Sequence, residues 1–167
     1  MANLDLMIKA WDTCHFELGE AFKGLPDEDV WRRAHPRLLS FGELVGHMMY
    51  WEAVRFTGPN LSEDLDLSEV GVKSPLVDHA FRYYTSNVEN TKALSMGAEE
   101  MWAEVQRIHA FTKAVITNAN PDSEDPIPSQ PKSTWGFALE YQVFHLGYHT
   151  GQCYSVRHLL GHETVDN

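Results

Sequence analysis

The sequence predicts an all-α protein: a four-helix bundle with an extra helical segment between the second and third helices. Apolar residues recur every three or four positions through most of the chain, which is the spacing of one helical face. Glycine, proline and capping residues stand at the ends of these periodic stretches. No stretch alternates apolar and polar residues as a half-buried strand does. The length of 167 residues fits a single domain over residues 1–167.

The first two helices are predicted from their apolar faces and their end signals. The first covers residues 4–22, and a Gly-Leu-Pro segment ends it. A short helical turn follows within residues 27–33. The second helix covers residues 41–57, because Ser40 stands three residues before Glu43 in a capping-box pattern. A Gly-Pro pair terminates this helix.

The rest of the chain is predicted to contain two loops, one helical segment and two long helices. Residues 60–73 are acidic without a sustained period and form a surface loop. Residues 74–94 begin with Ser-Pro, which is typical of an N-cap and first helical turn, and form the extra helical segment. A helix over 98–119 precedes a loop over 120–133, which holds four prolines. The last helix covers residues 134–160.

The charge of the chain excludes two classes of partner. Lys and Arg number 13 against 24 Asp and Glu, which gives a formal net charge of -11. Because nucleic acids and anionic membranes are bound through clustered cations, we expect neither as a partner. Cys14 and Cys153 are far apart in apolar helical stretches, so we expect reduced thiols in a cytoplasmic protein. We expect no targeting segment and no membrane span.

Two of the nine histidines are spaced to share a metal ion in the last predicted helix. His145 and His149 are four positions apart, so their rings project from one face, separated by about 40°. The apolar residues on the same face point both rings toward the bundle interior. Buried imidazoles need partners for their nitrogens, and a divalent transition metal provides one. Taken alone, the pair is also compatible with two structural histidines.

A tight site needs a third ligand, and His47 is the best candidate. It lies at the edge of the apolar stripe of the helix over 41–57. His15 also lies on an apolar helix face and is the runner-up. The other five histidines are predicted to be loop, surface or terminal residues: His35, His79, His109, His158 and His162.

Five further polar residues are candidates for contacts around the ligands. Gln152 follows the histidine pair by one turn, and Tyr148 and Tyr141 are near it. These three can contact a ligand from outside or touch a substrate. Glu43 and Glu52 could orient an imidazole N–H, but an exposed helix surface is the interpretation that we prefer for both.

Three segments of the chain resemble the DinB/YfiT-like family of metalloenzymes. The matching pieces are GLPDEDVWRR, then SFGELVGHMMYWEAVRF, and finally TWGFALEYQVFHLGYHTGQCYSVRHLLG. Their order and separation fit the family, so the resemblance covers essentially the whole chain. It implies a four-helix bundle of up-down-down-up topology. It also implies a mononuclear zinc or nickel site of three histidines, which carry over onto His47, His145 and His149.

The resemblance implies a class of reaction but not one substrate. Three neutral histidines leave a coordination position open, as in catalytic rather than structural zinc. Family members include thiol S-transferases that use low-molecular-weight thiols such as bacillithiol, and a mycothiol-dependent isomerase. We therefore expect a thiol S-transferase or a hydrolase with a small-molecule substrate. The alternative is a non-catalytic, stress-related bundle in which a bound metal stabilises the fold.

The last predicted helix also indicates an assembly. Apolar residues surround it almost completely, and a helix of this kind is covered on more than one side. We therefore expect a homodimer with this helix, together with a second helix, at the interface.

Overall fold

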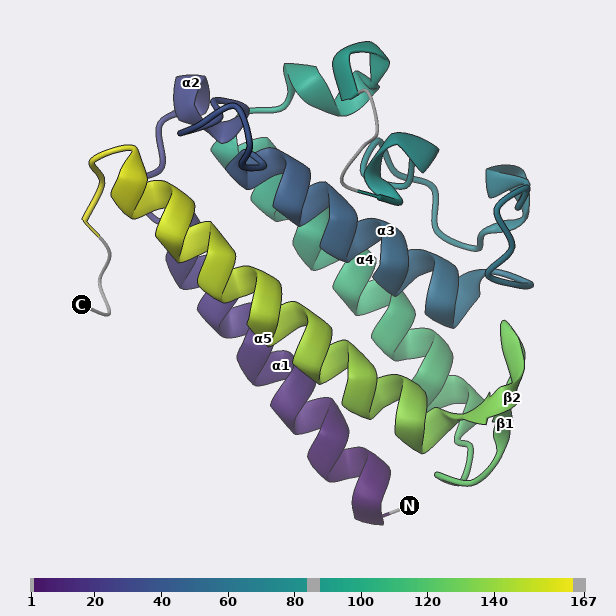
Figure 1. Cartoon of the computed structure of the whole chain (residues 1–167). Helices are drawn as coiled ribbons and strands as arrows, with labels where there is room; N and C mark the ends of the chain where they lie inside the picture. The colour runs from purple at the N-terminus through teal and green to yellow at the C-terminus, as the bar shows by residue number, and fades with distance from the viewer. Residues whose placement is uncertain (1, 84–87, 164–167) are drawn as a thin grey trace.

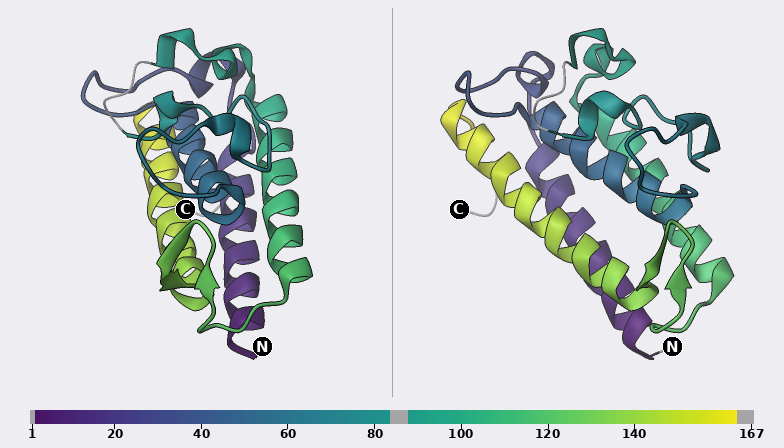
Figure 2. Two further views of the ribbon diagram at one scale, coloured as in Figure 1. Left: turned by 90° about the vertical axis from the view of Figure 1, so that its right-hand side faces the viewer. Right: turned by 45° about the vertical axis from the view of Figure 1, so that its right-hand side comes forward.

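Four long helices lie side by side in the computed structural model, which describes residues 2–83 and 88–163 (Figure 1). They are α1 (Ala2–Phe22), α3 (Phe41–Thr57), α4 (Ala98–Ala119) and α5 (Trp135–Leu159). The helix α5 packs against α1 and α3, and α3 packs against α4 (Figure 2). The expected all-α class is confirmed, since the described strands form only one short hairpin.

The helix ends follow the capping signals of the sequence. The Oγ atom of Ser40 accepts from the backbone N–H of Glu43, and the Glu43 carboxylate accepts from the N–H of Ser40. The predicted capping box of α3 is therefore confirmed. The side chain of Thr134 caps α5, and Asn120 ends α4 in the left-handed conformation with φ 44°. The expected short turn is α2 (Asp27–Val30).

The helical segment predicted for residues 74–94 is wrong as a continuous helix. Its described residues form short 3-10 turns, and residues 84–87 lie outside the described part. The turns of the whole connection are η1 (Leu67–Glu69), η2 (His79–Phe81), η3 (Val88–Asn90) and η4 (Lys92–Ser95). The side chains of Ser74 and Asp78 accept from backbone N–H groups two residues ahead. Such local bonds compete with helix formation.

A β-hairpin stands within the segment predicted as a loop over 120–133. The strands β1 (Pro126–Ile127) and β2 (Gln130–Thr134) pair antiparallel. The hydroxyl of Ser129 between them donates to the carbonyl oxygen of Arg55 at 2.5 Å. This bond holds the hairpin against the end of α3. The local periodicity of the sequence does not indicate such a hairpin.

The helix α3 is buried along almost its whole length, with Trp51 and Thr57 the two residues not fully buried. It is covered by α4, by α5 and by the connection between α3 and α4. The ring of Phe81 from this connection lies so close to Gly46 that a Cβ atom there would clash. Side chains that project from α3 in three directions are therefore inside the protein.

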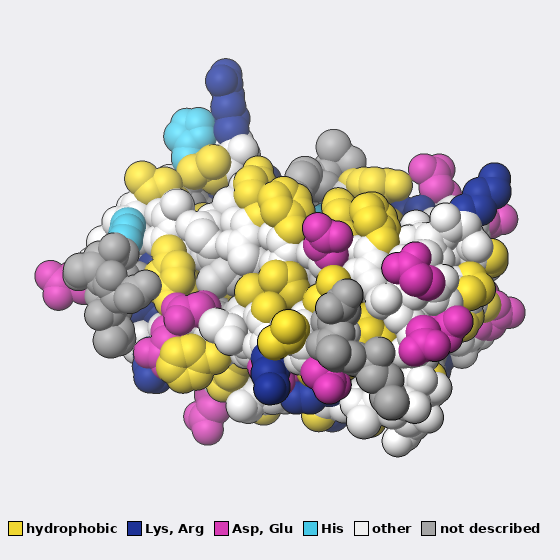
Figure 3. All heavy atoms as spheres, turned by 90° about the horizontal axis from the view of Figure 1, so that it is seen from below, with side chains coloured by type: hydrophobic (Ala, Val, Ile, Leu, Met, Phe, Trp, Pro, Cys, Tyr) yellow, Lys and Arg dark blue, Asp and Glu magenta, His cyan; other side chains and the backbone are white. Residues whose placement is uncertain are grey.

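The surface exposes hydrophobic side chains next to acidic ones on the face seen in Figure 3. The most exposed large apolar residues include Leu6, Phe16, Phe144 and Leu159. Among the described residues, every helix is too short or too polar to cross a membrane.

Candidate metal centre

Three histidines from two helices meet in the interior. His47 comes from α3, and His145 and His149 come from neighbouring turns of α5. Each ring offers one nitrogen, and these nitrogens all lie within 4.8 Å of one another. All three residues are buried. The structure thus brings together the three histidines that the sequence singled out.

Hydrogen bonds at the outer nitrogens set the orientation of two rings. The Nδ1 atom of His47 lies 2.9 Å from the carbonyl oxygen of Phe81, and Nδ1 of His149 lies 2.6 Å from Oε1 of Gln152. Because both partners are acceptors only, each Nδ1 carries the proton and donates. The Nε2 atoms of His47 and His149 then carry lone pairs and can bind a metal ion.

The third ring is placed for the same purpose. The Nε2 atom of His145 lies 3.2 Å from Nε2 of His47. Its Nδ1 atom is buried and has no hydrogen-bond partner among the described residues. With the proton of His145 at Nδ1, the facing Nε2 atoms of His145 and His47 would both present lone pairs to a cation bound between them. The donor set therefore fits a divalent transition metal.

The environment keeps these rings neutral. Burial, together with the neighbouring His149 and His47, lowers the pKa of His145 to about 2. Burial also lowers the pKa of His47 to about 4, although its bond to Phe81 opposes the shift. The pKa of His149 is lowered by burial as well. Neutral imidazole is the form that binds metal, so the three rings are in the metal-binding form at pH 7.

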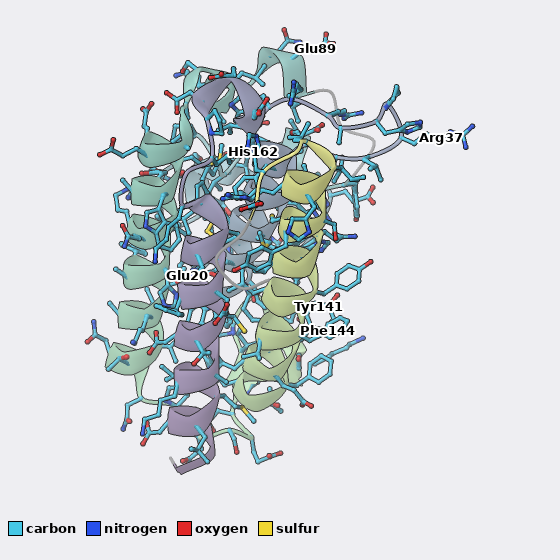
Figure 4. The ribbon with its side chains drawn as sticks, turned by 90° about the vertical axis from the view of Figure 1, so that its left-hand side faces the viewer. Glu20, Arg37, Glu89, Tyr141, Phe144 and His162 are labelled. Carbon is cyan, nitrogen blue, oxygen red and sulfur yellow. The ribbon has the colours of Figure 1, made fainter. Side chains whose placement is uncertain are left out.

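The three histidines line one wall of a cavity of about 600 Å³. Six aromatic side chains form much of the lining: Trp51, Tyr83, Phe137, Tyr141, Phe144 and Tyr148. Two arginines, Arg55 and Arg82, also line it, and no described lining residue is acidic. In Figure 4, Tyr141 and Phe144 project from α5 on the side away from α1. The site is therefore open to a small molecule.

A family model describes most of this chain. The model of the DinB superfamily matches residues 10–153, which include all three clustered histidines. The chain belongs to the DinB superfamily. The resemblance noted in the sequence is thereby confirmed. No curated protein and no solved structure matches the chain.

In this member of the DinB superfamily, Gln152, Tyr148 and Tyr141 lie beside His145 and His149. Gln152 accepts from His149, and its amide nitrogen donates to the hydroxyl of Tyr148 at 3.3 Å. The ring of Tyr141 stacks on His145 with centroids 6.1 Å apart. Both tyrosines are also partly exposed to the cavity. They are placed to touch a ligand as well as the histidines.

A second cluster of metal-ligating groups lies elsewhere in the DinB-superfamily bundle. His15, the runner-up ligand, is grouped with Glu52 and His109 rather than with the three histidines. Its Nε2 atom lies 2.9 Å from the Glu52 carboxylate, and its ring stacks on His109 with centroids 3.7 Å apart. The prediction that Glu52 and Glu43 are exposed is wrong, since both are buried. The prediction that His109 is an incidental surface residue is also wrong.

The only face predicted for α3 was an apolar stripe, so Arg55 was not predicted to lie at the site. This residue follows His47 by eight positions, and the half-buried Trp51 lies midway between them. Residues four positions apart share a helix face, so this spacing was the signal that could have placed Arg55 beside the site. The carbonyl of Phe81 gave no such signal, because it comes from a short 3-10 turn in the connection between α3 and α4.

Proposed function

We propose that this protein is a metal-dependent enzyme that acts on a small molecule at a mononuclear centre. The ligands are His47, His145 and His149, and zinc or nickel is the metal. One observation carries the proposal: the three imidazoles converge in the wall of an open cavity of about 600 Å³. Structural zinc sites are closed by four protein ligands, whereas catalytic sites keep a position open to substrate. A non-catalytic, stress-related metal protein needs no such cavity.

The chemistry is that of an activated nucleophile. A divalent metal held by neutral imidazoles lowers the pKa of a coordinated water or thiol, so that the anion exists at pH 7. Phe81 and Gln152 hold the outer nitrogens of two ligand rings and fix their direction. The aromatic walls exclude water and pack against the apolar part of a substrate.

Thiol S-transfer is the reaction type that the lining favours over hydrolysis. A hydrolase of this kind commonly uses a carboxylate as general base beside its metal-activated water. No described residue of the cavity lining is an aspartate or glutamate. A low-molecular-weight thiol needs no such base once its pKa is lowered. We therefore propose S-transfer from a thiol cofactor, with hydrolysis as the second candidate.

The proposal includes the up-down-down-up helix order of the family. In Figure 1, α1 and α5 run toward the end of the bundle where α2 lies, and α3 and α4 run away from it. These directions support that order.

Metal content and turnover together test the proposal. We expect the purified wild-type protein to bind zinc or nickel at about one ion per chain, and His149→Ala to bind neither. The matched control is His158→Ala, which changes an exposed histidine of the same helix. The loaded protein is then screened with thiols and electrophiles, and products are identified by mass spectrometry. Turnover that needs both metal and thiol supports S-transfer, and turnover without thiol supports hydrolysis. Metal binding without turnover favours the non-catalytic alternative.

A further inference from the structure

Arg55 is a buried cation in the wall of the cavity. It lies near the end of α3, only 7% exposed, and lines the same cavity as the three histidines. Its guanidinium carbon lies 4.8 Å from the centroid of the Tyr141 ring. Its positive charge contributes to lowering the pKa of both His47 and His145.

The charge of Arg55 is not directly paired with a carboxylate. Its Nη1 atom donates to Oε1 of Gln142 at 2.5 Å, and it forms no ion pair among the described residues. The amide nitrogen of Gln142 in turn donates to Glu52 at 3.3 Å. The amide of Gln142 therefore stands between Arg55 and the Glu52 carboxylate. This carboxylate is further engaged by His15 and Thr112.

Arg55 remains charged in this setting. Burial lowers its pKa to about 10, and Tyr141 and Glu52 oppose the shift. A guanidinium with that pKa is protonated at pH 7. A buried cation that lacks a direct counter-ion pairs favourably with an anion brought to it by a ligand.

The rest of the cavity lining has the same sign of charge. Arg82 is 6% exposed, and its guanidinium donates to the carbonyl oxygens of Leu61 and Ser62. It is held as part of the wall but adds to the positive potential. Because no described lining residue is acidic, the cavity is positive in a chain whose net charge is -11. This local reversal of charge favours anionic ligands over cationic ones.

We propose that the substrate carries an anionic group, a carboxylate, sulfonate or phosphate, that pairs with Arg55. The apolar part of the substrate packs against the aromatic walls beside it, including Tyr141 and Phe137. The inference rests on the proposed function where it names the substrate of the metal centre. The pairing with Arg55 itself requires no metal, so the two can be tested separately.

Two probes of the same shape isolate the charge. Phenylacetate and phenylacetamide share the ring and the methylene group and differ in the anionic group. Binding is measured by calorimetry with metal-free protein, prepared with a chelator, and again with zinc-loaded protein. We expect metal-free wild-type protein to bind phenylacetate at least about tenfold more tightly than phenylacetamide, since bonds between charged groups exceed neutral ones by this factor. Equal affinities for the two probes would overturn the proposal.

Substitutions of Arg55 assign the preference to this residue. Arg55→Gln should bind both probes with similar affinity. Arg55→Lys retains the positive charge and is the second variant if Arg55→Gln does not fold. It should show a reduced preference for phenylacetate, because lysine lacks the planar guanidinium group. The matched control is Arg107→Gln, which changes an exposed arginine of α4 that pairs with Glu104. An unchanged preference in a folded Arg55 variant would exclude the assignment.

The two forms of the protein separate this inference from the proposed function. A preference for phenylacetate in the metal-free form that disappears in Arg55→Gln supports the anion site, even if no metal activity is found. Conversely, metal-dependent turnover of anionic substrates by Arg55→Gln with an unchanged KM would leave the metal centre intact and refute the role of Arg55.

Discussion

The Nε2 atom of His145 on α5 lies 3.2 Å from Nε2 of His47 on α3, and the buried Nδ1 atom of His145 has no hydrogen-bond partner among residues 2–83 and 88–163. In His47 the proton is held at Nδ1 by the carbonyl of Phe81, so its Nε2 atom is an acceptor. In the absence of a cation, the Nε2–H of the neutral His145 ring therefore donates to it. With the proton of His145 at Nδ1 instead, both Nε2 atoms would present lone pairs to a bound cation.

The first prediction is that zinc or nickel stabilises the wild-type protein against heat. A ligand that binds only the folded state adds about 2.7 kcal/mol to the free energy of unfolding at roughly 100 times its Kd. His145→Ala removes one of three ligands, so its melting temperature should not respond to either metal. Differential scanning fluorimetry with added metal and then with chelator measures this. The exposed-site variant His158→Ala should respond as the wild type does, and a His145→Ala protein that still gains stability would exclude the site.

The second prediction concerns the partner of His149. Gln152 accepts from Nδ1 of this ring at 2.6 Å, which fixes the tautomer that binds metal. Loss of such an outer partner typically reduces metal affinity about 10- to 100-fold. We therefore expect this reduction for Gln152→Ala in competition with a chromophoric chelator. Ser155→Ala, an exposed change nearly one turn away on α5, is the control. Equal affinities of the two variants would show that Gln152 does not orient the ligand.

The third prediction is a pH dependence of stability that depends on Glu43. Burial raises the pKa of this carboxyl, but hydrogen bonds from Arg33 and Ser40 lower it more, so it lies below its ordinary value of 4.5. A carboxyl with a depressed pKa stabilises the folded state above 4.5, and this contribution disappears as pH falls through the folded pKa. At pH 7 we expect the free energy of unfolding of Glu43→Gln to be about 1 kcal/mol lower than that of the wild type.

Urea unfolding at several pH values checks this third prediction. The difference between wild type and Glu43→Gln should be full at pH 7 and should shrink progressively below pH 4.5. Glu124→Gln changes an exposed carboxyl and serves as the control. A difference that stays constant down to pH 3 would contradict the role of the Glu43 charge.

The fourth prediction is that Glu52 is essential for stability. Its carboxylate is fully buried and accepts from Trp11, His15, Thr112 and Gln142. Breaking a buried polar cluster by removing one member costs about 3–5 kcal/mol, because the remaining groups lose their partner. Glu52→Ala should lose this much in chemical unfolding. Glu140→Ala on the exposed side of α5 should change stability by less than about 0.5 kcal/mol.

The burial of the Glu52 carboxylate could not be predicted from the sequence. Periodicity and capping are local, so the long helices and the inward direction of His145 and His149 could be read from residue spacing. The burial of Glu52 depends on α1, α4 and α5 packing around α3 together, and an acidic residue in a helix otherwise indicates solvent. The prediction of a continuous helix over residues 74–94 was wrong for a related reason. The carbonyl of Phe81 accepts from His47 and not from a backbone N–H of a helix. Tertiary contacts of this kind leave no local pattern.

The last prediction is that the protein is a homodimer through α5. Phe137, Phe144 and Tyr148 are 58%, 63% and 54% exposed on this helix, and burying such rings against a second copy is favourable. Sedimentation velocity at micromolar concentration should therefore give twice the chain mass of 19.0 kDa. Phe144→Lys should shift the protein toward monomer, whereas Phe111→Lys on α4 should not. These rings also line the cavity, so a dimer would cover its mouth, and dilution to monomer should then speed ligand dissociation. A wild-type monomer at micromolar concentration would instead assign the exposed rings to ligand binding alone.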